Sequence, residues 1–350
     1  MHHPLQVLKH YWGYDGFRPG QAEVIDSILS GHDTLALMPT GGGKSITFQV
    51  PALANSGICL VISPLVALMK DQVKNLQKRG ILSAFISSEM PHWEILQQLD
   101  NCVLGDYKFL YISPERISSE LFQEKLKTLS SKVNLLVVDE AHCISQWGND
   151  FRRDYRLIAD IRDAIPHVQV IAVTASATAA VVADICEQLH FRKGYRIFKT
   201  SFERKNLSFV VRKTDNKLKE ICHILSAVPG SAVIYSRTRK GVEEYAGKLR
   251  AAGISAEYFH AGLDPVLKTE RQADWVKGFT RVLVATNAFG MGIDKGDVRV
   301  VIHTEFPDSM EAYYQEAGRA GRDGKRAYAV ALLGPQDITC LLYTSPSPRD

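Results

Sequence analysis

The sequence has 350 residues, 45% of them hydrophobic and 23% charged, and its formal net charge is +4. This length and composition suit two ordinary hydrophobic cores and exclude an intrinsically disordered chain. No apolar run reaches the length of a membrane span, and the N-terminus lacks the basic and apolar regions of a signal peptide, so we expect a cytosolic or nuclear protein.

Short runs of apolar and β-branched residues recur in the first half of the chain. They predict strands over 34–38, 58–63, 108–113, 134–140 and 168–175. Helix-like stretches lie between them, including 64–79, 116–128 and 177–190. Strands that alternate with helices are typical of a parallel sheet covered on both faces. We therefore predict an α/β domain over residues 1–200.

The first of these strands runs into PTGGGKS (39–45) and then into a helical stretch, which is the context of a phosphate-binding loop. Glycines let backbone N–H groups converge on phosphate oxygens, Lys44 would reach the β- and γ-phosphates, and Ser45 would offer a hydroxyl to Mg²⁺. Met38 replaces the first glycine of the generic pattern, and an ordinary glycine-rich turn is the alternative. We expect ATP to be bound by Thr40, Gly41, Gly42, Gly43, Lys44 and Ser45.

Two carboxylates, Asp139 and Glu140, follow the apolar strand predicted over 134–140. Ligands lie at the carboxyl ends of parallel strands, so Asp139 is placed to hold Mg²⁺ and Glu140 to orient or deprotonate the attacking water. A lone acidic pair is usually solvated surface, but a phosphate loop earlier in the chain favours function. His142 is either a core histidine or, as we prefer, a residue that couples the ATP site to the second domain.

The strand pattern repeats over 231–236, 256–260, 281–286, 299–304 and 328–333, with helical segments at 238–252 and 264–277. This predicts a second α/β domain over 208–338, joined to the first by a short polar linker at 201–207. The Ser/Pro-rich residues 339–350 fit neither strand nor helix, and we expect a frayed terminus or an artefact of assembly.

The segment QEAGRAGRDG (315–324) carries Arg319 and Arg322. On a helix, a spacing of three residues places both side chains on one face. They could be a solvated basic face, but with a phosphate loop in the other domain we favour arginine fingers that stabilise transition-state charge, an effect worth ~10³–10⁵ in rate.

The six cysteines lie far apart and none form a C-x-x-C pair. This spacing argues against a zinc ribbon and against a disulfide framework, so we expect reduced thiols and no zinc. The mildly basic charge permits a polyanionic partner but does not require one.

Together these segments resemble superfamily 2 helicases, specifically the RecQ family of DNA helicases, over about residues 5–337. GYDGFRPGQ (13–21) is similar to the adenine-recognition motif, and PTGGGKS and DEAH match motifs I and II. SPLVALMKDQV, YISPER, TASAT, YSRTRK, HAGL, ATNAFGMGIDK and YYQEAGRAGRDG are similar to the remaining motifs. The resemblance implies two RecA-like domains, each with a mostly parallel sheet and helices on both faces.

The resemblance also implies roles for individual residues. The residues expected to bind the base of the nucleotide are Tyr14, Arg18 and Gln21. The residues expected to contact the DNA strand are Ser63, Ser113, Arg116, Ser236 and Thr286. The residues expected to couple ATP hydrolysis to movement are His142, Thr174 and Ser176.

The segment AHCISQWGNDFRRDY (141–155) is similar to the aromatic-rich loop of RecQ proteins. Trp147 and Phe151 offer faces on which bases can stack, and Arg152 offers charge or a π face. Core packing is the alternative for an isolated aromatic pair. The chain departs from the family at Asn149, where histidine is frequent, and at Arg153 and Gly296, where proline is common.

The function implied is an ATP- and Mg²⁺-dependent helicase that moves 3′ to 5′ on single-stranded DNA in repair and recombination. We expect a monomer that binds single-stranded DNA and single-strand/duplex junctions and no membrane. Zinc and winged-helix modules of many relatives are missing from this sequence, so strand translocation is better supported than processive unwinding. The rivals are an RNA-dependent ATPase or remodeller, a nucleic-acid clamp with a decayed ATP site, and an unrelated kinase with a phosphate loop.

Overall fold

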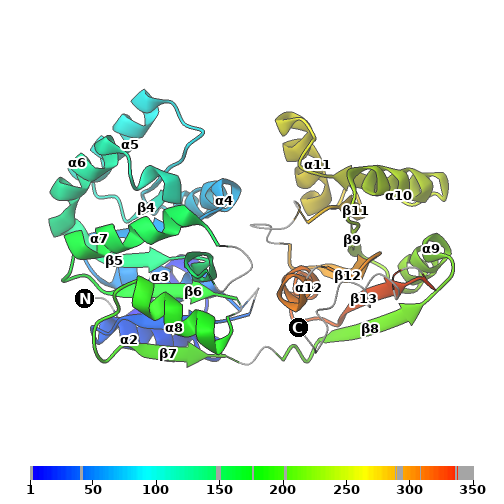
Figure 1. Cartoon of the computed structure of the whole chain (residues 1–350), viewed down its shortest axis with the longest axis horizontal. Coiled ribbons are helices and arrows are strands. Elements are labelled where there is room, and N and C mark those ends of the chain that lie inside the picture. The colour runs from blue at the N-terminus through cyan, green and yellow to red at the C-terminus, as the bar shows by residue number, and fades with distance from the viewer. Residues whose placement is uncertain are drawn as a thin grey trace. The chain divides into compact units, whose positions relative to one another are not determined.

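The computed structural model describes residues 3–39, 42–146, 151–175, 177–200, 203–287, 289, 295–307, 309–335 and 337, with Glu311 described by its backbone alone. The chain divides into two compact units, Met1–Phe202 and Glu203–Asp350, and each holds one sheet with helices (Figure 1). Four candidate residues, Thr40, Gly41, Trp147 and Ser176, lie outside the described residues, as do residues 339–350.

The first unit is built on a sheet in which all neighbouring strands run parallel. Its spatial order is β3 (Ser83–Ile86), β4 (Phe109–Ile112), β2 (Ile58–Ile62), β5 (Val133–Val138), β6 (Val170–Thr174), β1 (Thr34–Leu37) and β7 (Arg196–Lys199). The strands β2, β5, β6 and β1 are largely apolar, and all of their residues except Asn134 are buried, as expected for a parallel sheet covered on both faces.

Alternate residues of these strands feed two separate hydrophobic clusters. Leu35 and Leu37 face one cluster, whereas Ala36 and Met38 face the other. The Leu35 side is covered by α5 (His92–Leu104), α6 (Glu120–Leu129), α7 (Ile158–Ala164) and α8 (Ala179–Gln188). The Ala36 side is covered by α1 (Pro4–Trp12), α2 (Gln21–Leu29), α3 (Lys44–Ala54) and α4 (Val66–Gln77). The unit is therefore a three-layer α/β/α structure.

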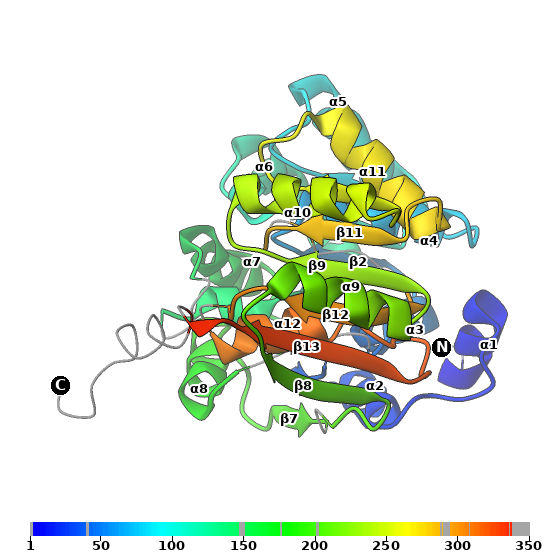
Figure 2. The ribbon, with the colours of Figure 1, turned by 90° about the vertical axis from the view of Figure 1, so that its right-hand side faces the viewer.

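The second unit repeats this plan with a second parallel sheet. Its spatial order is β10 (Ala256–Phe259), β11 (Val282–Ala285), β9 (Ser231–Tyr235), β12 (Val298–His303), β13 (Ala327–Leu333) and β8 (Leu207–Lys213). Figure 2 shows α9 (Lys217–Ala227) and α10 (Arg239–Ala251) in front of this sheet, where they form one cluster with it. Trp275 of α11 (Pro265–Lys277) and residues of α12 (Met310–Ala317) form the cluster of the other face.

The predicted fold class is confirmed, and each strand expected from the sequence occurs within a residue or two of its expected position. The strands that the sequence analysis missed, β3, β7 and β8, all lie at sheet edges. β7 and β8 are only partly buried, so they lack the continuous apolar run by which the central strands were found, whereas β3 is mostly buried but is only the four residues SAFI. The expected linker also overlaps β8 at Leu207, whose strand pairs with β13.

Candidate active site

The phosphate-loop sequence connects β1 to α3, as its strand–loop–helix context predicts. Gly43 is the residue before the helix and has φ of 77°, a left-handed conformation that favours glycine. A Cβ atom on Gly43 would lie 2.4 Å from Nε2 of Gln21, and one on Gly42 would lie 2.9 Å from the carbonyl oxygen of Pro39. The loop therefore has no room for side chains at these two positions, and Lys44 and Ser45 begin α3 directly after it.

Lys44 meets the acidic pair that follows β5. Its Nζ lies 3.3 Å from Oε1 of Glu140, and both side chains are about 15% exposed, at 15% and 14%. Glu140 itself has φ of 46°, which is rare for a residue with a side chain and is found at functional sites. The structure thus brings the phosphate loop and the acidic pair together at the carboxyl edge of the sheet.

Asp139 sits beside this ion pair. Its Oδ1 accepts a hydrogen bond of 3.0 Å from the backbone N–H of Glu140, and the hydroxyl of Ser63 lies 3.5 Å from Oδ2. Burial and, second, the negative charge of Glu140 raise the pKa of Asp139 to about 6. A divalent cation would relieve both effects, because it stabilises the charged carboxylate.

These residues fit Mg²⁺ and a nucleotide phosphate. Mg²⁺ is usually held by one or two carboxylates together with waters and phosphate oxygens. Among the described residues no group of three or more metal-binding side chains occurs, so a single carboxylate, Asp139, with the hydroxyl of Ser45 is the donor set that the loop offers.

His142 connects the acidic pair to β6. Its Nδ1 lies 2.8 Å from the hydroxyl of Thr174 and 3.5 Å from Oε2 of Glu140. Thr174 is fully buried, and its carbonyl accepts a 3.0 Å hydrogen bond from the backbone N–H of Met38. A continuous polar path therefore runs from Glu140 through His142 and Thr174 to the residue that precedes the phosphate loop.

The three residues expected at the nucleotide base lie before and at the start of α2. Gln21 is buried, and its amide is fully engaged: Oε1 accepts from the N–H of Arg18 at 2.8 Å, and Nε2 donates to the carbonyls of Gly42 and Gly43 at 3.3 and 3.1 Å. Tyr14 is 52% exposed, so its ring is accessible for stacking. In this structure Gln21 braces the phosphate loop.

In the first unit, most of the residues expected to contact the DNA strand make hydrogen bonds within the protein. Arg116 donates to the carbonyls of Ser87 and Ser88 at 3.0 and 3.1 Å, and Ser113 is buried at the end of β4. Arg152 donates to the carbonyl of Pro64 at 3.3 Å. Phe151 is half-buried, and the guanidinium of Arg156 lies 5.3 Å from its ring centre.

Ser236 and Thr286 lie side by side in the second unit. They directly follow β9 and β11, whose last residues, Tyr235 and Ala285, are register partners. The N–H of Ser236 donates to the carbonyl of Ala285 at 2.9 Å. The sequence analysis assigned these residues to two separate motifs, and parallel pairing brings them to one edge.

The expectation that Arg319 and Arg322 lie on a helix is wrong. The helix α12 ends at Ala317, and both arginines lie in the turns that follow it. Gly318 follows the helix directly, and Gly321 has φ of 63°, so the glycines of GRAGRDG end the helix early. Arg319 is buried, at 7% exposed, whereas Arg322 is half-buried.

Two tyrosines hold these catalytic candidates and were not assigned from the sequence. The hydroxyl of Tyr155, which is fully buried, donates to the carbonyl of Asp139 at 2.9 Å. Tyr235 is hydrogen-bonded to Arg319, and its hydroxyl donates to the carbonyl of Phe289 at 3.0 Å; burial raises the pKa of Tyr235 to about 12. Both tyrosines lie within segments that resemble helicase motifs. Their place in those segments was the sequence signal that could have identified them.

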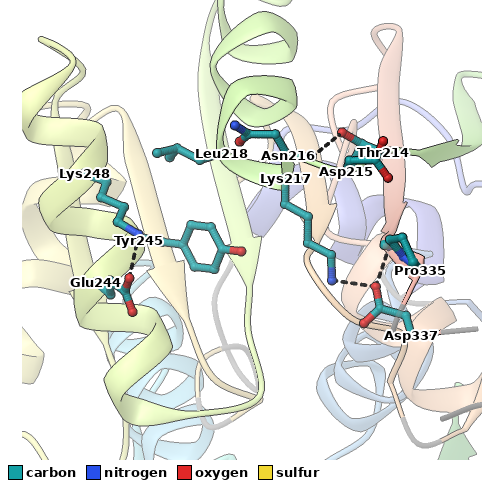
Figure 3. A pocket seen from close by; sticks show the side chains of 11 residues that line it. Thr214, Asp215, Asn216, Lys217, Leu218, Glu244, Tyr245, Lys248, Pro335 and Asp337 are labelled. Atoms are coloured by element: carbon teal, nitrogen blue, oxygen red, sulfur yellow. Dashed lines mark hydrogen bonds and ion pairs between the residues drawn. The ribbon is translucent and has the colours of Figure 1, made fainter. Parts of the chain in front are cut away.

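A pocket of about 570 Å³ lies apart from these residues, at the carboxyl ends of β8 and β13 (Figure 3). Both of its lysines are paired: Lys217 lies 2.6 Å from Asp337, and Lys248 lies 2.5 Å from Glu244. Because their charges are neutralised by these carboxylates, the pocket offers little attraction to a phosphate, and we assign it no role.

Comparisons with protein families match both units. The family of DEAD/DEAH box helicases matches residues 18–185, and the conserved C-terminal helicase domain matches residues 216–324. Solved structures with this fold include helicase Lhr of Mycobacterium smegmatis bound to single-stranded DNA (TM-score 0.76, 19% identity, 97% of this chain and 49% of that one). The DUF1998 helicase MrfA bound to DNA is another (TM-score 0.78, 17% identity, 99% of this chain and 54% of that one). Both units therefore have the RecA-like helicase fold.

Relatives with closer sequences share one family. The ATP-dependent DNA helicase RecQ of Bacillus subtilis is 43% identical over 341 residues, which are 97% of this chain and 57% of the relative. RecS of the same organism is 39% identical over 338 residues, 95% of this chain and 67% of the relative. The chain thus spans little more than half the length of the RecQ relatives it matches. No helix in the described part is both long and apolar enough to cross a bilayer. On these similarities, the chain belongs to the RecQ family of ATP-dependent DNA helicases.

Proposed function

We propose that this chain is a helicase core that hydrolyses ATP and uses the energy to move 3′ to 5′ along single-stranded DNA, in DNA repair and recombination. The observation that carries the proposal is the contact between Lys44 and Glu140, which joins the phosphate loop to the acidic pair. A kinase with a phosphate loop is not supported, because the family matches cover both units.

In the proposed mechanism, the backbone N–H groups of residues 40–45 and the ammonium of Lys44 hold the phosphates of ATP. Glu140 orients or deprotonates the attacking water, since its carboxylate lies at the loop and is oriented by Lys44 and His142. When bound, Mg²⁺ supplies positive charge to the β- and γ-phosphates, with Asp139 and Ser45 as its protein donors. All of these donors lie in the first unit.

Arg319 and Arg322 complete the proposed site. Their guanidinium groups would stabilise the charge that develops on the transferred phosphoryl group. Because the arginines belong to the second unit and the lysine and acids to the first, we propose that ATP is hydrolysed at a cleft between the units. Closing and reopening of this cleft would then step the protein along the strand.

The DNA strand would be gripped through its phosphates by Ser63, Ser113, Arg116, Ser236 and Thr286, while Trp147, Phe151 and Arg152 contact its bases. Contacts to phosphates carry no sequence information, so we propose sequence-tolerant, salt-sensitive binding. His142, Thr174 and Ser176 would couple this binding to hydrolysis, which the path from Glu140 to Thr174 supports.

We further propose a monomer that acts at single-strand/duplex junctions, in the cytoplasm of a bacterium or the nucleus of a eukaryote. The alternative is a DNA- or RNA-stimulated ATPase that translocates without processive unwinding. This alternative has to be tested, because residues that bind phosphates do not distinguish DNA from RNA.

One experiment tests the proposal and its alternative. ATP hydrolysis is measured with no nucleic acid, with single-stranded DNA and with RNA of the same sequence, and strand separation is measured on duplexes with 3′ or 5′ overhangs. The proposal expects stimulation by DNA above RNA and separation of the 3′-overhang duplex alone. Equal stimulation by RNA, without strand separation, would favour the alternative, and hydrolysis indifferent to both would refute the helicase assignment.

A further inference from the structure

The position of Arg319 and Arg322 depends on the turn that carries them. This turn follows α12 and spans residues 318–324, so the carbonyls of Gly318, Ala320 and Gly321 lie beyond the hydrogen bonds within the helix. The last carbonyls of a helix and the turn after it need donors from elsewhere. The residues that supply these donors therefore set the path of the turn.

Arg204 supplies hydrogen-bond donors to three carbonyls of this turn. Its Nη2 donates to the carbonyls of Ala320 and Gly321 at 3.0 and 2.7 Å, and its Nη1 lies 3.4 Å from the carbonyl of Gly318. A single planar guanidinium thus contacts three carbonyls of the turn, on both sides of Arg319. Its positive charge also lies at the C-terminal end of α12, where the helix dipole favours a cation.

Asn206 holds the same turn from a neighbouring position. Its Nδ2 donates to the carbonyls of Gly321 and Lys325 at 2.7 and 2.8 Å. A Cβ atom on Gly321 would lie 2.6 Å from this nitrogen, so the glycine allows the close approach. The carbonyl of Asn206 accepts from the N–H of Ala327 at 2.9 Å, which continues the pairing of β8 with β13.

The side chain of Arg319 has a separate anchor. It is hydrogen-bonded to Tyr235, at the end of β9. The turn is therefore held from several sides: its carbonyls by Arg204 and Asn206, its buried arginine by Tyr235, and the N–H groups of Gly321 and Asp323 by the carbonyls of Val298 and Gly296, at 2.9 and 3.1 Å. Loss of Arg204 leaves the bonds to Val298 and Gly296 in place but removes the contacts to the three carbonyls that flank Arg319.

We infer that Arg204 is a positioning residue for hydrolysis, which fixes the turn that carries Arg319 and Arg322; this inference rests on the proposed function of those arginines. Arg204 stands two residues after Phe202, where the first unit ends in sequence. A displacement of the chain at residues 203–206 would thus reach the arginine turn through the side chains of Arg204 and Asn206.

The test uses Arg204→Ala and a matched control, Arg281→Ala. Arg281 caps α9 in the same unit in the same way: it donates to the carbonyls of Gly230 and Val228 at 3.1 Å each, and also to that of Leu225. Both variants lose an arginine that holds carbonyls after a helix, but only Arg204 holds the arginine turn. The full chain is assayed for kcat and KM of ATP hydrolysis with saturating single-stranded DNA and for stability against urea.

We expect Arg204→Ala to lower kcat by about 10- to 100-fold with little change in KM for ATP, because a misplacement of about 1 Å costs about 10²-fold. Arg281→Ala should keep kcat within about twofold even if it loses as much stability. If Arg204→Ala does not fold, Arg204→Lys replaces it, since lysine keeps the charge but not the planar set of donors, and the same loss of kcat is expected.

A combined variant separates positioning from an independent role. If Arg204 acts through the two arginines of the turn, Arg204→Ala should lower kcat no further in a chain that already carries Arg319→Ala and Arg322→Ala. Three results would overturn this inference but not the proposed function: losses of kcat that multiply in the combined variant, an unchanged kcat in the Arg204 variants, or a loss of kcat in Arg281→Ala as large as that in Arg204→Ala. Wild-type kcat in Arg319→Ala would instead overturn the proposed role of the arginine itself and, with it, the inference.

Discussion

The ammonium of Lys44 lies 3.3 Å from the carboxylate of Glu140, although 96 positions separate the two residues in the chain. The contact arises because β1 and β5 are parallel strands of one sheet, so that the loops after both strands emerge at the same edge. It brings a group that can hold phosphates next to a group that can activate water.

Lys44→Ala should abolish ATP hydrolysis, with a loss of at least about 10²-fold in kcat, because no other side chain of the loop carries positive charge. The fold should survive, since Lys44 is partly exposed and does not belong to the hydrophobic core. Lys125→Ala is the control; it also removes a lysine from an ion pair, that with Asp100. Near-normal hydrolysis by Lys44→Ala would remove the central assignment.

Glu140→Gln should lower kcat by about 10²–10⁴-fold and leave binding of ATP largely intact, because the amide keeps the shape of the side chain but is not a base. Steady-state hydrolysis gives kcat, and equilibrium titration with a fluorescent ATP analogue gives the affinity. A variant that loses affinity as completely as Lys44→Ala would show that Glu140 serves binding rather than activation of water.

Asp139→Asn should change how stability depends on pH. The pKa of Asp139 is raised above the ordinary value of 3.8, so the folded protein binds this proton more tightly than the unfolded chain. The wild type therefore loses stability as pH rises from about 4 to about 6, and the asparagine variant does not suffer this loss. The advantage of the variant should grow across this interval to about 1–3 kcal/mol and then stay constant.

Urea unfolding of both proteins between pH 4.5 and 7.5, without nucleotide or Mg²⁺, measures this difference. Asp264→Ser provides a reference for loss of an exposed carboxylate, because serine can still cap α11 with its side-chain oxygen. A difference between Asp139→Asn and wild type that does not vary with pH would contradict the raised pKa.

Thr174→Val should uncouple DNA binding from hydrolysis. The change removes the hydroxyl that meets His142 at 2.8 Å but keeps the shape of a fully buried side chain. Stimulation of ATP hydrolysis by single-stranded DNA should fall by about tenfold or more, with DNA affinity retained. Thr34→Val is the control, because Thr34 is equally buried in the same sheet and its hydroxyl is also hydrogen-bonded. Equal effects of the two changes would point to a structural role for Thr174.

Trp147→Ala should preserve hydrolysis in the absence of DNA and weaken its stimulation by single-stranded DNA, since stacking of a base on an aromatic ring is worth ~1–3 kcal/mol. The concentration of DNA that gives half-maximal stimulation is the quantity to measure. Trp93→Ala, which removes a tryptophan that is 67% exposed on α5, is the control. If single-stranded DNA stimulates ATP hydrolysis by Trp147→Ala as it does in the wild type, Trp147 serves packing and does not bind DNA.

The edge strands and the arginine turn show where sequence reasoning reached its limit. Central strands were found because burial on both faces demands an unbroken apolar run, as in LLVV of β5. β7 and β8 escaped because they are only partly buried. Arg319 and Arg322 were assigned to a helix by their spacing, but α12 ends at Ala317 and Gly318 follows it, before either arginine.

The sequence by itself determined the fold class, the family and the identity of the chemical groups: a lysine and glycines in one loop, two carboxylates after a strand, and two arginines among glycines. These features are local, and each is written in a few consecutive residues. Partners distant in the chain were decided only by the tertiary structure: Glu140 against Lys44, Thr174 against His142, and Arg204 against the arginine turn. Such contacts depend on the order in which parallel strands pair and on hydrogen-bond donors that reach a turn from distant segments. No local pattern in the sequence encodes either of these.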